Sequence, residues 1–420
     1  MNIIDIYKKM PLPVKASLWY MVCSILQKGV NVITTPIFTR MMSTDQYGLV
    51  TIYNSWESII TVIATLNFTA GVYNNAMIRY ENDRDGYTSV LQIWTTIISV
   101  GLFLIYFPTR ELWNNIFDLP TFLIGVMFAD IILTSAMSFW TVRNRYEFKY
   151  ASVCAVTLSA SIVAPILSIV LVCSTDSHKG EAKIIGTTLA HLIIYGIVYI
   201  LILKRGRIFF NKEYISYSTK FNIPLIPHYL SQSIFSQADR VMINNMCSMA
   251  KAGIYGVAYQ AGFIINIVTS AINASFVPLL YENMKRGNYD RINKMAFVIQ
   301  IVVGSTCFLF SLFAPELIML LATEEYYEAI WIIPPVAMSS LFIMMYSFFT
   351  NVEFYFGKNK FIMISSVIVA GINILLNWLF IPVYGYLSAG YTTLFCYFIY
   401  SIAQYLFMIK TCKKKKVCNP

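Results

Sequence analysis

The chain has 420 residues, of which 57% are hydrophobic and only 12% charged, and its mean hydropathy is +0.62. A soluble domain carries about 25% charged residues, so this composition excludes a soluble globular protein and predicts a polytopic membrane protein. Twelve spans of about 20 apolar residues each would use nearly the whole chain and leave no room for a sizeable soluble domain.

Hydropathy predicts an all-α fold with about twelve transmembrane helices joined by short loops. The first is expected to be a retained helix, because residues 1–15 and the apolar run after them show no small-residue cleavage site of a signal peptide. The spans are predicted at 16–38, 48–72, 87–107, 119–141, 151–173, 183–203, 220–243, 253–280, 296–321, 329–351, 361–381 and 388–409.

Lysine and arginine are distributed unevenly between the two sets of loops. If the N-terminus is cytoplasmic, 24 of the 31 lie in inside segments, and Lys28 and Arg240 fall within spans. The five in outside loops are Arg40, Arg110, Lys179, Lys183 and Lys251. Cytoplasmic loops carry the excess of Lys and Arg, so both termini are predicted to be cytoplasmic. The lysine run 413–416 is interpreted as a topology anchor, with contact to anionic lipid as the alternative.

The net charge of +10 is explained by this topology, and no nucleic-acid partner is predicted. The eight cysteines are scattered, mostly in apolar runs, without a C-x-x-C pair or metal-ligand spacing. We therefore expect neither a disulfide framework nor a metal site.

Two short motifs recur in the second half of the chain. Met41-Met42-Ser43 with Gly48 matches Met246-Cys247-Ser248 with Gly253, and Tyr80-Glu81-Asn82 matches Tyr281-Glu282-Asn283. With six spans in each half, the repeat is parallel about an axis along the membrane normal, a common plan of transporters. The sequence thus predicts two six-helix lobes, 1–215 and 216–420, the second ending in a basic cytoplasmic tail.

The stretch 221–245 is long enough to cross a bilayer, yet it carries His228, Gln232, Asp239 and Arg240. A side chain charged at bilayer depth costs about 2.5–3.5 kcal/mol on insertion scales, so such residues are expected to face protein or water and to serve a function. Asp239 and Arg240 project about 100° apart on a helix, so we expect each to have a partner other than its neighbour.

Other spans carry polar residues at helical spacing along one face. They are Ser24, Lys28, Asn31 and Thr35 in the first span, Asn54, Glu57 and Thr61 in the second, Tyr259, Gly262, Asn266, Thr269 and Asn273 in the eighth, and Asn373 and Asn377 in the eleventh. Such stripes either line a hydrated cleft between lobes or hold helices together. Lys28 and Glu57 either act in function or neutralise each other. Asp130, in the fourth span, is either functional or reaches the outer surface.

Three segments carry a resemblance to a known family: Thr-Pro-Ile-Phe-Thr-Arg-Met-Met-Ser-Thr-Asp-Gln-Tyr-Gly (35–48), Gln-Ala-Asp-Arg-Val-Met-Ile (237–243) and Ala-Gly-Ile-Tyr-Gly-Val-Ala-Tyr-Gln (252–260). With them, essentially the whole chain resembles the Wzx-like O-antigen and capsule repeat-unit flippases, which are polysaccharide biosynthesis proteins of the multidrug/oligosaccharidyl-lipid/polysaccharide (MOP) exporter superfamily. The resemblance implies two lobes in a V, alternating access and a place in the bacterial inner membrane. The implied cargo is an undecaprenyl-diphosphate-linked oligosaccharide, moved to the outer leaflet for O-antigen, capsule or exopolysaccharide assembly.

Members of this family present cations to a central cavity, and by position Lys28, Arg40 and Arg240 are the matching substrate-binding candidates. The polar residues expected to bond sugar hydroxyls are Asn31, Asn54, His228, Tyr259 and Asn266. The candidates to bind a coupling proton or sodium ion are Glu57, Asp130 and Asp239, and no other cofactor is expected. The expected partners are the lipid-linked glycan, membrane lipids, and the polysaccharide polymerase and chain-length machinery.

Two other functions are considered. A cation-coupled multidrug exporter of the same superfamily is kept open by Glu57 and Asp130. A membrane enzyme that processes glycans finds little support, because no outer loop is long and no histidine has Asp five residues on. No nucleophile elbow or phosphate-binding glycine loop occurs either. The sequence therefore predicts a transporter and not an enzyme.

Overall fold

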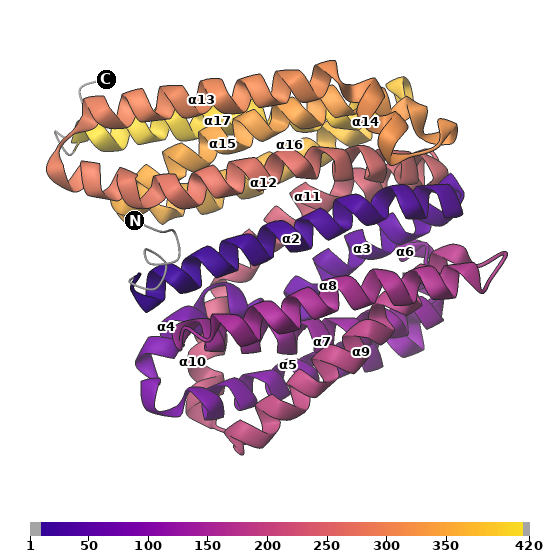
Figure 1. Cartoon of the computed structure of the whole chain (residues 1–420), viewed down its shortest axis with the longest axis horizontal. Helices are drawn as coiled ribbons and strands as arrows, with labels where there is room; N and C mark the ends of the chain where they lie inside the picture. Colours follow the sequence, from indigo (N-terminus) through magenta and orange to yellow (C-terminus); the bar gives the residue numbers. More distant parts are fainter. Residues whose placement is uncertain (1–9, 415–420) are drawn as a thin grey trace. The chain divides into compact units, whose positions relative to one another are not determined.

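The computed structural model describes residues 10–414, and these are almost entirely helical (Figure 1). The predicted all-α class is confirmed, and no strand occurs among the described residues. Two lysines of the predicted basic tail, Lys415 and Lys416, lie outside them. The long helices are α2 (Leu12–Met41), α3 (Thr44–Ala64), α5 (Arg84–Tyr106), α7 (Thr121–Tyr146), α8 (Tyr150–Cys173), α9 (Lys179–Gly206), α11 (Ile226–Met246), α12 (Met249–Arg286), α13 (Tyr289–Leu312), α15 (Ile333–Tyr355), α16 (Asn359–Tyr384) and α17 (Ser388–Lys414).

Each of these helices coincides with one predicted span. Ten helical segments in the described part of the chain are long and apolar enough to cross a membrane. The other two spans, α3 and α11, are helices of 21 residues whose polar side chains lower their hydropathy. The protein is thus a multi-pass membrane protein, in agreement with the prediction of about twelve transmembrane helices. The shorter elements are η1 (Phe68–Ala70), α4 (Val72–Arg79), η2 (Glu81–Asp83), η3 (Phe107–Thr109), α6 (Arg110–Phe117), α10 (Lys212–Asn222), η4 (Ile223–Leu225), α14 (Ala314–Leu321) and η5 (Glu324–Trp331).

Two helices end earlier than hydropathy predicts. The second span was expected to reach residue 72, but α3 ends at Ala64 because Leu66 and Asn67 adopt left-handed backbone angles, with φ of 47° and 46°. The Asn222 amide donates to the carbonyl oxygens of Leu66 and Asn67, at 2.9 Å each, and so satisfies groups that the broken helix leaves open. The ninth span was expected to run to 321, but a new helix, α14, begins after Phe313 with Pro315 in its first turn, where proline is favoured.

The chain forms two compact units. The N-terminal unit comprises the residues up to Thr34 and Ile52–Leu230, and the C-terminal unit comprises Thr35–Thr51 and the residues from Ser231 onward. The tip of the first helical hairpin therefore packs with the second half of the chain. The lobes 1–215 and 216–420 stay a prediction from the repeated motifs, whereas these units describe packing.

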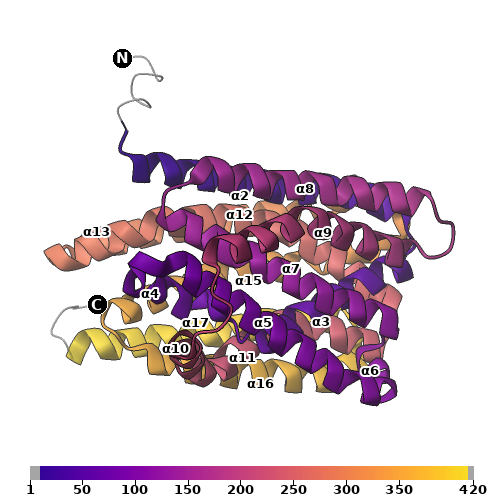
Figure 2. The same ribbon diagram turned by 90° about the horizontal axis from the view of Figure 1, so that it is seen from below.

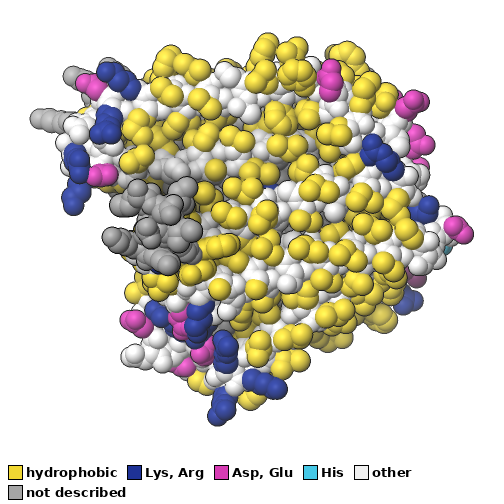
Figure 3. Space-filling model, in the orientation of Figure 1, with side chains coloured by type: hydrophobic (Ala, Val, Ile, Leu, Met, Phe, Trp, Pro, Cys, Tyr) yellow, Lys and Arg dark blue, Asp and Glu magenta, His cyan; other side chains and the backbone are white. Residues whose placement is uncertain are grey.

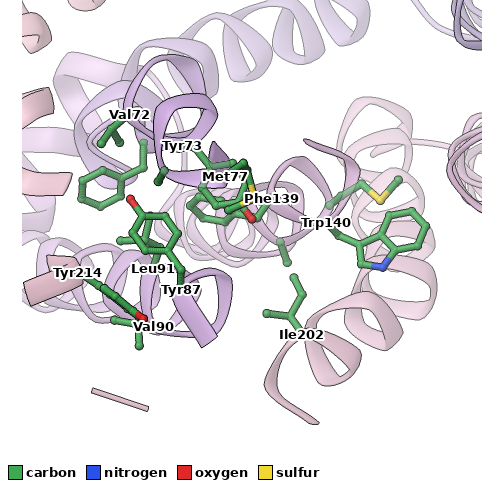
Figure 4. Close-up of a cluster of buried hydrophobic side chains, with 14 of the residues drawn as sticks. Val72, Tyr73, Met77, Tyr87, Val90, Leu91, Phe139, Trp140, Ile202 and Tyr214 are labelled. Carbon is green, nitrogen blue, oxygen red and sulfur yellow. The ribbon is translucent and has the colours of Figure 1, made fainter. Parts of the chain in front are cut away.

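In the N-terminal unit, α5, α7, α8 and α9 pack against one another, and the first part of α2 runs beside α8 in both views (Figures 1 and 2). The α2–α8 contact includes the stacked rings of Trp19 and Tyr150, whose centroids are 6.4 Å apart. Buried aromatic and aliphatic side chains form the core at one end of the unit (Figure 4). Its labelled members are Val72, Tyr73, Met77, Tyr87, Val90, Leu91, Phe139, Trp140, Ile202 and Tyr214.

In the C-terminal unit, α15 packs against α12, α13 and α17, and α16 packs against α17. Many large apolar side chains of both units stay exposed, as lipid-facing residues must. Figure 3 shows hydrophobic side chains over the middle of the helices, with charged side chains gathered near helix ends. This distribution matches a bilayer around the middle of each unit and water at its ends.

The repeated motifs form equivalent helix starts. Ser43 and Gln46 make a capping box at the start of α3, in which the Gln46 backbone N–H donates to Ser43 Oγ and the Gln46 side-chain Oε1 accepts from the Ser43 backbone N–H. At the start of α12, Ser248 Oγ accepts from the Lys251 backbone N–H at 3.2 Å. Serine thus serves as the N-cap at both positions of the repeat.

The two equivalent glycines meet each other within the C-terminal unit. A Cβ atom on Gly253 would lie 2.3 Å from the Thr44 carbonyl oxygen and 2.8 Å from the Gly48 backbone nitrogen. A Cβ atom on Gly48 would lie 2.0 Å from the Met249 carbonyl oxygen. Only glycine allows this approach of α3 and α12, as in small-residue crossings of membrane helices.

We predict that Gly253→Ala destabilises the protein by about 1–3 kcal/mol, because the backbone atoms that the methyl group meets cannot rotate away. Gly371→Ala is the matched control, since no atom lies within 4 Å of a Cβ at that helical position. Thermal unfolding in detergent measures both. Equal midpoints for Gly253→Ala and wild type would contradict the close crossing.

Candidate functional site

The best-formed polar centre of the C-terminal unit surrounds Asp239 of α11, whose side chain is fully buried. Its carboxylate accepts hydrogen bonds from the hydroxyls of Tyr255 and Thr393 and from the amide of Asn377, each at 2.7 Å. Tyr259 adds a longer bond of 3.4 Å. Four donors saturate the oxygens of an ionised carboxylate, which can only accept, so the arrangement suits the charged form of Asp239.

A second layer of side chains holds these donors. The Asn373 amide donates to Thr393 Oγ1 at 3.1 Å, and Asn377 donates to Asn373 Oδ1 at 3.4 Å. Thr392 Oγ1 donates to Asn377 Oδ1. The network joins α11, α12, α16 and α17, and its members all carry oxygen atoms, the ligand type that hard cations prefer.

Arg240 points away from its neighbour, as the helical geometry predicts. Its Nη1 donates to the Ser236 carbonyl oxygen at 2.5 Å and to Gln237 Oε1 at 3.1 Å, while the guanidinium lies 4.1 Å from the centroid of the Tyr259 ring. Tyr259 therefore contacts both charged residues, with its hydroxyl toward Asp239 and its ring face toward Arg240. Arg240 is half-buried, so part of its guanidinium stays accessible.

The N-terminal unit holds a second acidic centre, around Asp130 of α7. Asp130 is 4% exposed, so it does not reach the outer surface, one of the two possibilities that its position suggested. Its Oδ1 lies 2.7 Å from Nδ1 of His191 on α9, and Glu57 of α3 is a neighbouring acid.

Aromatic rings enclose this acidic centre. The ring of Tyr195 stacks on His191 with centroids 4.5 Å apart and an angle of 17° between planes. Tyr53, buried on α3, is a neighbour of Glu57 and Asp130. The contact between His191 and Asp130 can hold a proton, because an imidazole N–H donates and a carboxylate accepts.

The remaining predicted residues fall in two places. Lys28 and Asn31 of α2, Asn54 of α3 and His228 of α11 belong to the N-terminal unit, and the His228 ring lies 5.7 Å from the ring of Tyr229. Arg40 and Asn266 belong to the C-terminal unit. Arg40 donates to the carbonyl oxygens of Pro36 at 2.9 Å and Leu320 at 3.3 Å, and so ties the hairpin tip to α14.

The structure thus brings Asp239, Arg240 and Tyr259 together in one unit, and Glu57 and Asp130 together in the other. Sequence reasoning missed several of their partners, namely His191, Tyr255, Thr392 and Thr393. It had noted Asn373 and Asn377, whose spacing of four was a usable signal. For the hydroxyl pair 392–393, no local signal sets it apart from other threonines in apolar helices.

A further buried carboxylate, Glu353 of α15, was also missed. With the Gln404 amide oriented to donate, its nitrogen lies 2.9 and 3.2 Å from the two Glu353 oxygens, and its oxygen accepts from Ser365 at 2.8 Å. Glu353 follows an apolar run and sits near the end of its span, where a carboxylate resembles an ordinary interfacial residue.

Comparisons with known proteins agree with the fold. The family model described as polysaccharide biosynthesis protein matches residues 14–284. Two Haemophilus influenzae proteins, Lsg locus putative protein 1 and an uncharacterized membrane protein, are each 22% identical over 84% of this chain and over 88% and 87% of their own length. The solved structure of lipid II flippase MurJ, in an inward closed conformation, aligns with a TM-score of 0.76 at 14% identity, over 94% of this chain and 87% of that chain.

An inward-facing multidrug resistance MATE family transporter of the MOP superfamily aligns with a TM-score of 0.69 at 12% identity, over 93% of this chain and 96% of that chain. At such identities, structural likeness shows the fold alone. The family model covers more than half of the chain, and it confirms the family that the resemblance predicted. The chain therefore belongs to the polysaccharide biosynthesis protein family and has the fold of MOP superfamily exporters.

Proposed function

We propose that the protein is a flippase that moves a polyprenyl-diphosphate-linked oligosaccharide repeat unit from the cytoplasmic to the outer leaflet. The observation that carries this proposal is the family match over residues 14–284. The fold shared with a lipid II flippase supports a lipid-linked glycan as the class of cargo. The product would enter O-antigen, capsule or exopolysaccharide assembly, where a polymerase and chain-length proteins are the proposed partners. The role is transport and not catalysis.

The physical problem of such a cargo is its head group. The polyprenyl tail can stay in hydrocarbon, whereas the diphosphate and sugars need a polar and partly cationic path. With the inside negative, moving anionic charge outward releases about 2.3 kcal/mol per charge per 100 mV. Cations along the path then serve to desolvate and orient the diphosphate.

Lys28 and Arg240 are the proposed diphosphate contacts. The planar guanidinium of arginine matches phosphate oxygens two at a time. In Arg240 this group is held by Ser236, Gln237 and the Tyr259 ring, so little side-chain freedom remains to be lost on binding. Asn31, Asn54, His228, Tyr259 and Asn266 are the proposed contacts to sugar hydroxyls, and Arg40 a further cation.

We predict that Arg240→Ala and Lys28→Ala each slow flipping of a fluorescent polyprenyl-diphosphate glycan in reconstituted vesicles by about 10- to 100-fold, the worth of one hydrogen bond to a charged group. Arg240→Lys should fall between wild type and Arg240→Ala, because it keeps the charge and loses the planar fork. Arg110→Ala, an outer-loop cation, is the control. Unchanged flipping by well-folded Arg240→Ala protein would remove the cationic contact.

We also propose that the two acidic centres couple transport to an ion gradient. The oxygen-rich surroundings of Asp239 suit a sodium ion or a proton. The contact between Asp130 and His191, with Glu57 as a neighbouring acid, suits a proton. In both centres a bound ion would replace hydrogen bonds that helices of the same unit now make. The ion would therefore bind with different affinity to the arrangement of helices that has these bonds and to one that lacks them.

We predict that Asp239→Asn and Asp130→Asn abolish the acceleration of flipping by an imposed ion gradient, while flipping without a gradient persists. Asparagine keeps the shape of aspartate but cannot take up a proton or neutralise a cation. Vesicles with a pH gradient, a sodium gradient or neither separate the two ions. If both variants respond to gradients as wild type does, neither centre is a coupling site.

A cation-coupled multidrug exporter is the second candidate. The buried carboxylates of both units and the fold shared with a MATE transporter favour it. Organic cations added to the flipping vesicles distinguish the two: they would compete with the substrate of a drug exporter and leave a glycan flippase unaffected.

We further propose that the protein lies in the bacterial inner membrane with both termini cytoplasmic. Cys173 ends α8 and is exposed, on the side that this topology makes external. We predict that a membrane-impermeant maleimide added to intact cells labels wild type and that Cys173→Ser loses most of the labelling. Cys247, also exposed and predicted external, accounts for the remainder. Labelling only after cell lysis would reverse the orientation.

A further inference from the structure

A polar cavity of about 520 Å³ lies at one end of the N-terminal unit, lined by residues other than those of the Asp130 centre. It forms where the start of α5, the end of α7, the α7–α8 turn and the end of α9 meet. The side chains that line it are Asp85, Arg143, Lys149, Lys204, Arg205 and Arg207. Five of these six residues are cationic, which points to an anionic ligand.

Two acids at this cavity, Asp85 and Glu147, are already paired with cations. Arg143, which is 7% exposed, binds Asp85 with two contacts of 2.6 and 2.8 Å and binds Glu147 at 2.5 Å. Lys149 binds Glu147 as well, at 2.5 Å. Burial disfavours the charged form of Glu147, but the hydrogen bonds from Lys149 and Arg143 hold its pKa below the usual value.

Three cations of the cavity are left over. Lys204, Arg205 and Arg207 are exposed and form no ion pair with any residue of the described part of the chain. Counting Asp85 and Glu147 against the five cations leaves an excess of three positive charges at the cavity. Arg143, one of the five, is buried.

The end of α9, which carries these three lining cations, packs against the start of α5. A Cβ atom on Gly206 would lie 2.4 Å from the Asp85 carbonyl oxygen, so the end of α9 rests directly on the start of α5. Arg207 follows with φ of 53°, a left-handed angle that ends the helix and turns the chain. This close packing and the turn at Arg207 fix the backbone that carries the three cations.

Two exposed aromatic residues come directly after the basic cluster. Phe209 and Phe210 are 66% and 70% exposed. Exposed phenylalanine beside lysine and arginine is typical of a segment that lies at the membrane surface, with its rings among the acyl chains. The cavity can accommodate a charged head group, and the phenylalanine pair that follows it in the chain can contact apolar acyl chains.

We propose that this cavity binds the phosphate of an anionic phospholipid in the adjacent leaflet, with Phe209 and Phe210 among its acyl chains. Basic pockets between transmembrane helices recognise anionic head groups in this way. The positive-inside rule accounts for cations on this side of the membrane, but it requires neither their convergence on one cavity nor the phenylalanine pair. The bound lipid would hold the segment that leads from α9 into α10.

Native mass spectrometry of the full chain in neutral detergent tests this proposal, with phosphatidylglycerol, phosphatidylcholine and soluble glycerophosphoglycerol as probes. Lys204→Gln/Arg205→Gln/Arg207→Gln should weaken the first bound phosphatidylglycerol by about tenfold or more. The matched control is Lys285→Gln/Arg286→Gln/Arg291→Gln, which removes three exposed cations of the C-terminal unit and should leave that binding unchanged. Thermal unfolding confirms that both triple variants are folded.

Phe209→Ser/Phe210→Ser supplies an independent test that keeps every charge. It should weaken phosphatidylglycerol several-fold and leave phosphatidylcholine adducts as in wild type. Equal losses in the two triple variants would show general charge attraction and overturn the proposal. Tight binding of glycerophosphoglycerol, unaffected by the phenylalanine substitutions, would make the cavity a site for soluble phosphate and overturn the lipid as its ligand.

Discussion

The hydrogen bonds that Asp239 accepts are the interaction on which the C-terminal unit depends most. A carboxylate in hydrocarbon is tolerated only when the protein itself supplies its donors, and here they come from three other helices, α12, α16 and α17. The same bonds therefore serve packing and chemistry. Any ion that binds Asp239 must take over some of these contacts, and the helices that lose them gain freedom to rearrange.

The two units surround their buried aspartates with different partners. Asp239 is surrounded by neutral donors from three helices, whereas Asp130 contacts His191 and has Glu57 as a neighbouring acid. The two centres lie on spans that the predicted repeat does not pair, since α11 begins its half of the chain and α7 is the fourth span. The break at Leu66 and Asn67 is a parallel case, because the corresponding stretch of α12 continues as a single helix through Arg286.

The fold class and the helices were predictable from sequence because apolar runs of about 20 residues report directly on the membrane. Hydropathy did not show the break after Ala64, because apolar residues continue through residue 72. Spacing of four residues revealed Asn373 and Asn377, which lie on one helix. It could not reveal that Asn377 and Thr393 meet Asp239, from which they are 138 and 154 residues away. Contacts between distant helices depend on packing that no local pattern records.

The hairpin tip Thr35–Thr51 has a consequence for biosynthesis. It leaves the ribosome among the first segments, yet the residues on which it packs, from Met249 through Tyr326, come about 200 to 280 residues later. At about 5–20 residues per second of synthesis, the tip waits on the order of 10–60 s in the membrane. During that time the Gly48 face of α3 has no partner, so quality control or a membrane chaperone would meet the chain in this state.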